Sequence, residues 1–339
     1  MKIDTAFRDP DLTTAARHAQ RLEALGFDCL WGIETAHDPF LPLAIAAAHT
    51  ERVNLGTNIA VAFARTPYVT ATIAWDLQAW SKGRFFLGLG TQVRPHVERR
   101  FSMPFDRPTA RIKDYIRCVR AIWDTFQHGS KPAYEGEFYR FTVTNPAFTP
   151  APLAGPMPPI YMAGVNALMC RAAGEVADGF QVHSFNSAAY LRDVVRANLD
   201  QGARLQGKTV DDFSIYATVF VVTGETQAEW DRLERDVRSR IAFYASTPSY
   251  RAVLEYHGFD GIAKELSRLS RIGEWEQMTD MITDEMLETF AVVAKPAELP
   301  RAMRERYAGL ATRVAMSQHV LRDDPDARWR QLTDGIHAG

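Results

Sequence analysis

Short apolar runs alternate with longer amphipathic segments along almost the whole chain, and this alternation limits the possible folds. Each short run has the length of a buried β-strand, and each longer segment has the apolar spacing of a helix. The regular order of strand and helix is typical of βα units around a parallel sheet. The predicted strands are Lys2–Phe7, Cys29–Ile33, Val53–Ala60, Phe85–Leu89, Ile160–Ala163, Gly179–His183, Ser214–Val222 and Arg313–Ser317.

The longer segments predict helices between these strands. They are Leu12–Leu25, Pro42–His49, Tyr68–Ser81, Thr109–His128, Asn166–Val176, Ser187–Leu205, Thr226–Ala245, Pro296–Tyr307 and Asp324–Asp334. Eight strands with intervening helices predict an α/β fold, a (β/α)8 TIM barrel, which commonly needs about 250 residues. We expect residues 1–339 to form one domain with insertions near 90–108, 130–159 and 246–288. The second insertion is expected to be a hairpin and loop, and the third a helical excursion over one end of the barrel.

Charge and composition argue against several classes of protein. Lys and Arg number 39 against 41 Asp and Glu, so no overall positive charge would attract nucleic acid or anionic lipid. The longest apolar stretch, near Phe40–Ala48, is less than half a membrane span. The three cysteines are too far apart for a zinc site. We therefore expect a cytoplasmic protein with reduced, buried cysteines that binds neither nucleic acid nor membrane.

Polar side chains follow several predicted strands at the carboxyl end, where a barrel of this kind places its active site. They are Glu34, His37, Arg94, His96, His183 and the segment Ser317–His319. We interpret His37 and Glu34 as site candidates, and Arg94 and His96 as contacts to an anion or substrate. Purely structural interpretations stay open: a helix cap for His37, a rim carboxylate for Glu34, and a solvated loop face for Arg94 and His96. His183 could likewise be a polar residue of the rim.

Two glycine turns bear on phosphate binding. Gly88 and Gly90 begin a dinucleotide-like pattern that lacks its third glycine and follows the fourth strand, which argues against a Rossmann fold. Gly164 to Asn166 opens a helix, where unpaired backbone N–H groups and the helix dipole favour a phosphate. A plain tight turn is the alternative. Since the sequence has no HExxH or GxSxG motif, we expect no catalytic metal, and an enzyme of this kind would need a bound cofactor.

Six segments of the chain carry a resemblance to a known family. They are WGIETAHDPFLPL (31–43), LGTNIAVAFARTP (55–67), SKGRFFLGLGTQ (81–92), YEGEFYRF (134–141), AGVNALMCRAAGEVADGF (163–180) and FAVVAKPAELPRAMRERYAGL (290–310). In this order they resemble the bacterial luciferase-like superfamily, and within it the deazaflavin-dependent oxidoreductases that use coenzyme F420. The resemblance covers nearly the whole chain.

The resemblance implies a flavin or deazaflavin at the carboxyl-terminal mouth of the barrel. It also implies a non-prolyl cis peptide that bulges from the third strand against the cofactor ring, at Asn58 and Ile59. The family's phosphate-binding turn maps onto Gly164, Val165 and Asn166. The approach to the ribityl-like tail maps onto Gly90, Thr91 and Gln92, where glycine permits close contact. The family is commonly homodimeric or of higher homo-oligomeric state.

The acidic residue that the family carries after its second strand maps onto Glu34. In many relatives a histidine follows directly, whereas this chain has Thr35 there and a histidine only at His37. We expect His37 to act as general acid and base, since imidazole titrates near neutral pH. Glu34 would position His37 or the cofactor.

The resulting hypothesis is an oxidoreductase that transfers a hydride between coenzyme F420 and a small organic substrate. Arg94 and His96 could hold an anionic or polar group of that substrate, and His183 would also contact the substrate. Trp31, Phe63 and Phe185 would line the mouth, unless they are simply core residues. Two alternatives stay open: a reduced-FMN-dependent monooxygenase of the same fold, and a catalytically silent flavin-binding protein.

Overall fold

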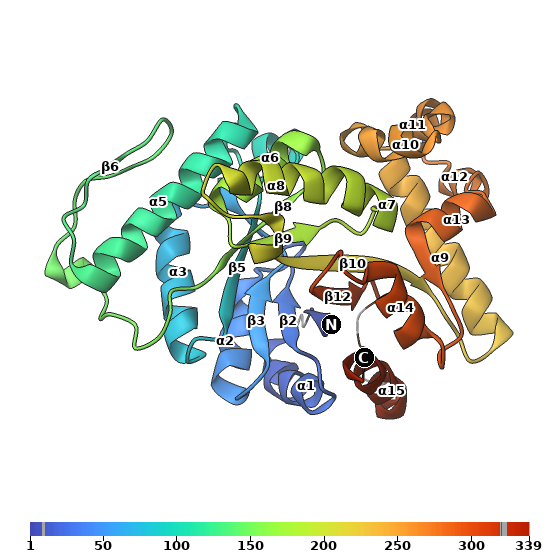
Figure 1. The fold of residues 1–339 in the computed structure, drawn as a ribbon, viewed down its shortest axis with the longest axis horizontal. Coiled ribbons are helices and arrows are strands. Elements are labelled where there is room, and N and C mark those ends of the chain that lie inside the picture. The colour runs from blue at the N-terminus through green and yellow to red at the C-terminus, as the bar shows by residue number, and fades with distance from the viewer. Residues whose placement is uncertain (9–10, 319, 321–323, 339) are drawn as a thin grey trace.

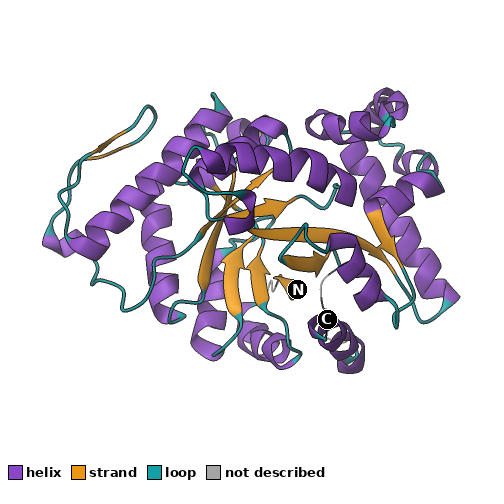
Figure 2. Cartoon of the chain, in the orientation of Figure 1, coloured by secondary structure: helices purple, strands orange, loops and turns teal. Residues whose placement is uncertain are grey.

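Parallel strands form a closed barrel at the centre of the structure, with helices around it (Figures 1 and 2). The computed structural model describes residues 1–8, 11–318, 320 and 324–338. The eight barrel strands are β1 (Lys2–Phe7), β2 (Cys29–Gly32), β3 (Asn54–Thr57), β5 (Phe85–Gly90), β8 (Ile160–Gly164), β9 (Gly179–Val182), β10 (Ser214–Val222) and β12 (Arg313–Met316). They pair in this order, and β12 pairs with β1 to close the ring. The predicted (β/α)8 TIM barrel is confirmed.

Helices follow the barrel strands as the sequence predicts. They are α1 (Leu12–Ala24), α2 (Phe40–His49), α3 (Pro67–Trp80), α5 (Pro108–His128), α6 (Ala167–Val176), α7 (Ala188–Tyr190), α8 (Ala197–Arg204), α9 (Gln227–Ala245), α14 (Leu299–Tyr307) and α15 (Asp326–His337). Side-chain caps define where several helices begin: the hydroxyls of Thr66 and Thr226 accept backbone N–H groups in the first turns of α3 and α9. A π-helical segment, Leu191–Arg196, joins α7 to α8. None of the described helices has the length and apolar content needed to cross a membrane.

The third predicted strand departs from its expected form. It is divided into β3 and the short β4 (Ala60–Val61), which pairs with β5 rather than continuing the β2 ladder. The division falls at Asn58–Ile59, where the peptide bond is cis, as the family resemblance implies. The end of β10 also pairs outside the barrel, with β11 (Ala291–Val293).

The three segments predicted as insertions each hold additional structure. The first contains α4 (Arg94–Arg99), and the second contains the antiparallel pair β6 (Tyr134–Glu135) and β7 (Arg140–Phe141). The third holds helices as predicted: α10 (Arg251–His257), α11 (Ala263–Ile272), α12 (Trp275–Asp280) and the start of α13 (Asp284–Phe290). Figure 1 shows the hairpin and these helices on opposite sides of the barrel.

A buried ion pair lies inside the barrel. Arg313 donates to both carboxylate oxygens of Asp4, at 2.7 and 2.8 Å, and Trp31 Nε1 donates to Asp4 at 2.9 Å. Trp31 is fully buried, and its ring occupies the space that a side chain at Gly56 would need. The expectation that Trp31 lines the mouth is therefore wrong: its ring fills the barrel interior and satisfies a buried carboxylate.

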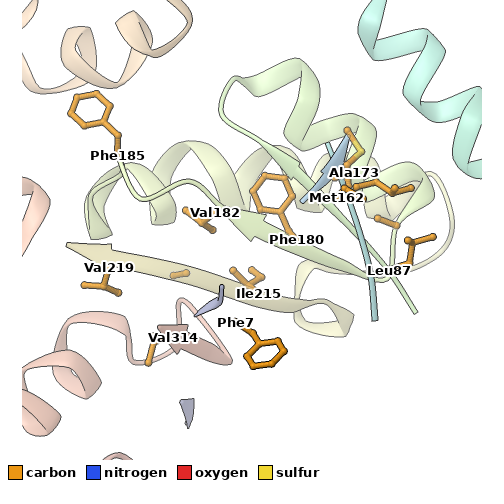
Figure 3. Close-up of a cluster of buried hydrophobic side chains, with 14 of the residues drawn as sticks. Phe7, Leu87, Met162, Ala173, Phe180, Val182, Phe185, Ile215, Val219 and Val314 are labelled. Carbon is orange, nitrogen blue, oxygen red and sulfur yellow. The ribbon is translucent and has the colours of Figure 1, made fainter. Parts of the chain in front are cut away.

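The main apolar core lies between the barrel strands and the surrounding helices. Figure 3 shows part of it, with Phe7, Leu87, Phe180 and Ile215 projecting from four different strands. All four are at most 1% exposed. The three cysteines are also buried and form no disulfide. Strands that are covered on one side by helices and filled on the other by side chains have no solvent-exposed face, which explains why most of their residues are apolar.

Candidate active site

The carboxyl ends of the barrel strands and the loops that follow them form what we call the barrel mouth. The Asn58–Ile59 bulge lies here, and it is attached to the strands on either side and across the barrel. Thr57 Oγ1 donates to Gly88 O at 2.7 Å and accepts the N–H of Gly88 at 2.9 Å. From the opposite side, Gln181 Nε2 donates to Thr57 O at 2.8 Å. These bonds fix the position of the bulge in the barrel wall.

Glycine makes room for the bulge on β5. A β-carbon at Gly88 would lie 1.8 Å from Thr57 O, and one at Gly90 would lie 2.9 Å from the Ile59 side chain. Gln181 Oε1, which is buried, has no hydrogen-bond partner among the described atoms. The absence of side chains at Gly88 and Gly90, together with the unpaired acceptor of Gln181, suits the close approach of a flat ligand.

Glu34 lies at the end of β2 and is 7% exposed. Its Oε2 accepts the N–H of Val61 and Nη1 of Arg65, both at 2.7 Å. Arg65 Nη2 reaches Asp38 at 2.9 Å. Burial acts to lower the pKa of Arg65, but the hydrogen bonds and charges of Glu34 and Asp38 outweigh it and raise that pKa. Glu34 therefore holds the segment that follows the bulge.

His37 is exposed on the loop between β2 and α2. Among the described residues, no hydrogen bond or ion pair joins His37 to Glu34. The helix cap that the sequence left as an alternative for His37 is instead supplied by Asp38, whose Oδ1 accepts the N–H of Phe40 at 2.8 Å and of Leu41 at 3.2 Å. Because of this cap, α2 begins at Phe40 rather than at the predicted Pro42. Arg100 donates to the carbonyl of Thr35 and ties the same loop to α4.

The predicted phosphate turn and the predicted tail approach lie at neighbouring strand ends. Leu89 of β5 is opposite Met162 of β8, so the residues that follow these two positions emerge side by side. Asn166 Oδ1 accepts the N–H of Met169 at 3.0 Å and begins α6. Within the described chain, the N–H groups of Ala167 and Leu168 meet no acceptor, which leaves two donors at a helix N-terminus.

Gly90, Thr91 and Gln92 are the residues predicted to contact the cofactor tail, and they lie at the end of β5 and directly after it. Gln92 has a φ of +59°, in the left-handed region that non-glycine residues seldom adopt. Its Oε1 accepts the N–H of Val93 at 3.0 Å, and its carbonyl accepts the Thr91 hydroxyl at 3.0 Å. These local bonds define the path of the chain past the end of β8. Val165 lies in the turn before α6 and is partly exposed.

Arg94 and His96 both lie exposed on α4. Arg94 forms an ion pair with Glu98 on its own helix at 2.7 Å, and its guanidinium lies 5.2 Å from the ring centroid of Phe105. Phe63 is fully buried, against Phe105 and beneath Arg111. Of the two interpretations of Phe63, the structure favours the core residue over the mouth residue, because this ring belongs to the core that supports the loop.

His183 follows β9 and lies within an aromatic cluster. Its Nδ1 accepts the N–H of Phe185 at 3.1 Å, and its Nε2 lies 3.1 Å from Tyr250 Oη. The ring centroids of Tyr244 and Tyr250 each lie 4.6 Å from that of His183. Burial lowers the pKa of His183 to about 4, so the ring is neutral at pH 7. With Nδ1 accepting, the proton resides on Nε2, which donates to Tyr250.

Tyr244, Tyr250 and Gln181 were not identified from the sequence. Tyr244 lies in the last turn of α9, and Tyr250 ends the 3₁₀ turn Pro248–Tyr250 inside the third inserted segment. That segment was expected over one end of the barrel, and its aromatic residues could have marked it as part of the mouth. Of the predicted segment Ser317–His319, Ser317 and Gln318 lie after β12, and His319 lies outside the described residues.

A surface cavity of about 700 Å³ lies at the other end of the barrel. Its lining includes Met1 and Thr312, which directly precede β1 and β12, together with Arg196 and Arg304. It contains none of the predicted site residues. Because reactive side chains gather at the carboxyl ends of barrel strands, we assign the active site to the mouth and not to this cavity.

Comparison with known proteins finds a matching sequence family and similar proteins that cover most of the chain. Residues 3–313 match the sequence family described as luciferase-like monooxygenase. An uncharacterised protein of Mycobacterium tuberculosis is 46% identical over 314 residues, covering 93% of this chain and 92% of that protein. A putative coenzyme F420-dependent oxidoreductase of the same organism is 28% identical over 288 residues, covering 80% of this chain and 81% of that protein.

The fold is shared with a solved structure as well. The coenzyme F420-dependent tetrahydromethanopterin reductase of Methanopyrus kandleri superposes with a TM-score of 0.80 at 22% sequence identity. The superposition covers 100% of this chain and 98% of that one.

Proposed function

Because this chain belongs to the luciferase-like monooxygenase family, we propose that it is an oxidoreductase that transfers a hydride between coenzyme F420 and a small organic substrate. The choice of the deazaflavin over FMN is supported by the 28% identical relative that carries F420 in its name. The reduced-FMN monooxygenase and the catalytically silent flavin-binding protein are the competing outcomes of the test below.

One observation carries the proposal: a glycine-lined strand end lies beside an open helix N-terminus. Gly90 to Gln92 and Gly164 to Asn166 follow paired strands, so a cofactor tail along the first would reach the second. The free N–H groups of Ala167 and Leu168 and the helix dipole favour a phosphate at that point. The residues present therefore fit a phosphate-bearing flavin or deazaflavin.

When bound, the deazaflavin supplies a carbon centre, C5, that gives or takes a hydride. Asn58 and Ile59 would form the wall behind its ring, and Glu34 would hold that wall through Val61 and Arg65. His37 would exchange a proton with the substrate as general acid and base. The neutral His183 orients the Tyr250 hydroxyl, whose own proton remains available to a substrate oxygen or nitrogen. Arg94 and His96, on α4, would contact the outer part of the substrate.

The test is a pair of cofactor titrations on the purified protein. We expect micromolar binding of oxidised F420, followed by its fluorescence, and much weaker binding of FMN. The variant Asn166→Asp keeps the N-cap oxygen but adds a negative charge at the phosphate turn, so F420 should bind at least about 10-fold more weakly. Asn145→Asp is the matched control, since Asn145 caps a 3₁₀ turn in the hairpin segment.

Each outcome of these titrations bears on the proposal. Tight FMN binding without F420 binding would support the monooxygenase, and binding of neither would overturn a cofactor role for the mouth. F420 binding with equal affinity in Asn166→Asp would remove the phosphate assignment. Binding without turnover of any hydride donor or acceptor would favour the silent flavin-binding protein.

We also propose a homodimer or higher homo-oligomer, as the family resemblance implies. The apolar side chains Leu41, Val69 and Trp80 are 57%, 48% and 59% exposed on α2 and α3. These two helices contain one charged residue other than histidine, Asp76. Light scattering should give a multiple of 38.1 kDa, and Leu41→Glu should shift it towards one chain. A monomeric wild-type protein would contradict this proposal.

A further inference from the structure

Two arginines lie at the side of the mouth where β12 pairs with β1. Arg8 directly follows β1, and Arg240 lies on α9. Arg240 Nη1 lies 3.4 Å from the carbonyl of Ser317, which follows β12. Because β12 pairs with β1, the residue that Arg240 contacts and Arg8 itself follow adjoining strands. Burial, and then the charge of Arg240, lower the pKa of Arg8, which keeps substantial surface exposure.

The two arginines differ in how far the carboxylates of the described residues neutralise them. Arg240 pairs with Asp236 at 3.0 Å. Arg8 forms no ion pair with any carboxylate in the described residues. Asp4, which faces the barrel interior from the same strand, is already bonded to Arg313 and Trp31. Since side chains alternate along a strand, Arg8 projects to the same side as Asp4, towards the open end of the barrel.

Arg8 also lies between the two parts of the candidate active site. Tyr216 and Tyr244 both act electrostatically to raise the pKa of Arg8. The Tyr216 hydroxyl hydrogen-bonds with the Asn58 side chain at the cofactor wall. Tyr244 packs edge-on against His183, with ring centroids 4.6 Å apart. An anion held by Arg8 would therefore lie next to both the cofactor wall and the aromatic cluster.

We propose that Arg8 and Arg240 bind an anionic group of the substrate, a carboxylate or a phosphate, and that Tyr244 and Tyr250 contact its apolar body. The proposal rests on the proposed function, because the substrate is the molecule that reacts beside the cofactor. A guanidinium presents planar, paired donors to such oxygens, and an uncompensated cation in a partly desolvated position attracts an anion strongly. Arg94 is less suited than Arg8 to provide the uncompensated charge, since Glu98 already neutralises Arg94 in solvent, whereas Arg8 has no carboxylate partner among the described residues.

The experiment measures ligand binding by titration calorimetry on the wild-type protein and on Arg8→Gln, Arg240→Gln and Arg17→Gln. The probes are benzoate, phenyl phosphate and benzyl alcohol, which share an aromatic ring and differ in charge. Arg17→Gln is the matched control, because Arg17 is an exposed arginine on α1. Circular dichroism checks that each variant is folded, and F420 titration is run on the same samples.

We expect the wild-type protein and Arg17→Gln to bind at least one charged probe more tightly than benzyl alcohol. Arg8→Gln should bind that probe about 10- to 100-fold more weakly, as expected for the loss of a charged hydrogen bond, with F420 affinity unchanged. Arg240→Gln should weaken it in the same direction. The charged probe that binds more tightly identifies the carboxylate or the phosphate.

Two results would overturn the proposal: equal affinity of the charged probes for wild type and Arg8→Gln, or no preference of the wild type for charge. Failure of the wild type to bind F420 would instead remove the proposed function. The probe titrations report anion binding directly, so the two failures are distinguishable.

Discussion

Glu34 accepts the backbone N–H of Val61 at 2.7 Å and so connects the end of β2 to the chain that leaves the Asn58–Ile59 bulge. The same oxygen accepts Nη1 of Arg65, which continues to Asp38. Glu34 therefore has a positioning role that does not depend on proton transfer. This arrangement also explains why an acidic residue after the second strand can serve the site without touching His37.

Replacing Glu34 by Gln tests this positioning role. Gln can still accept the Val61 N–H, but the charge on Arg65 is then opposed only by Asp38. We expect a loss of about 1–3 kcal/mol in the free energy of unfolding, measured by urea denaturation, and weaker F420 binding. Asp38→Asn is the control: it keeps the helix cap and removes a more exposed charge, so the loss should stay below about 1 kcal/mol. Unchanged stability in Glu34→Gln would contradict this interpretation.

His37→Ala tests the assigned general acid and base. If His37 exchanges the proton, its removal should lower the rate of cofactor reduction or oxidation about 10²- to 10⁴-fold at unchanged F420 affinity. Single-turnover absorbance of the deazaflavin measures the rate. His49→Ala is the matched control, because His49 lies exposed at the end of α2, where its Nδ1 lies 2.8 Å from Ile45 O of the same helix. A rate equal to wild type would exclude His37 from the reaction.

His183 predicts a pH dependence of stability. Its pKa is lowered from 6.5 to about 4 by burial, so the neutral ring is favoured in the folded state. The contribution is fully present above pH 6.5 and is lost as the pH falls towards 4, because only the unfolded chain then gains the proton. The total loss is about 3 kcal/mol.

Urea denaturation between pH 7 and pH 4 measures this loss. His183→Gln should lose less stability over that range than the wild type, whereas His96→Gln, which changes an exposed histidine, should follow the wild type. The same slope in His183→Gln and wild type would show that the ring is protonated in the folded protein.

Gly90→Ala probes the glycine-lined wall. The added carbon would lie 2.9 Å from the end of the Ile59 side chain, which must move towards the mouth. We expect F420 to bind about 10-fold more weakly with a loss of stability near 1 kcal/mol, since the displaced atoms belong to a side chain. Gly155→Ala is the control, because a β-carbon there meets nothing within 4 Å. Undiminished F420 affinity in Gly90→Ala would show that the ring does not approach β5.

The alternation of apolar runs was enough to predict all eight barrel strands, because a strand buried on both sides has a short, continuous apolar sequence. The helix starts were less certain, since a cap such as the one Asp38 gives α2 depends on a side-chain bond. The same continuous burial hides which side chains of a strand face inward. Nothing in the pattern distinguishes Trp31, which fills the interior, from a residue of the mouth.

The turn before α6 was also visible in the sequence, because a glycine followed by an N-cap asparagine predicts the start of a helix from local residues alone. The meeting of His183 with Tyr250, and of Arg8 with Arg240, was not. These pairs are separated by 67 and 232 positions along the chain, and only closure of the barrel and the return of α9 over its end bring them together. The sequence by itself determined the order and length of the barrel elements, because these follow from local periodicity. Only the tertiary structure decided which side chains share the mouth, because their neighbours come from distant segments.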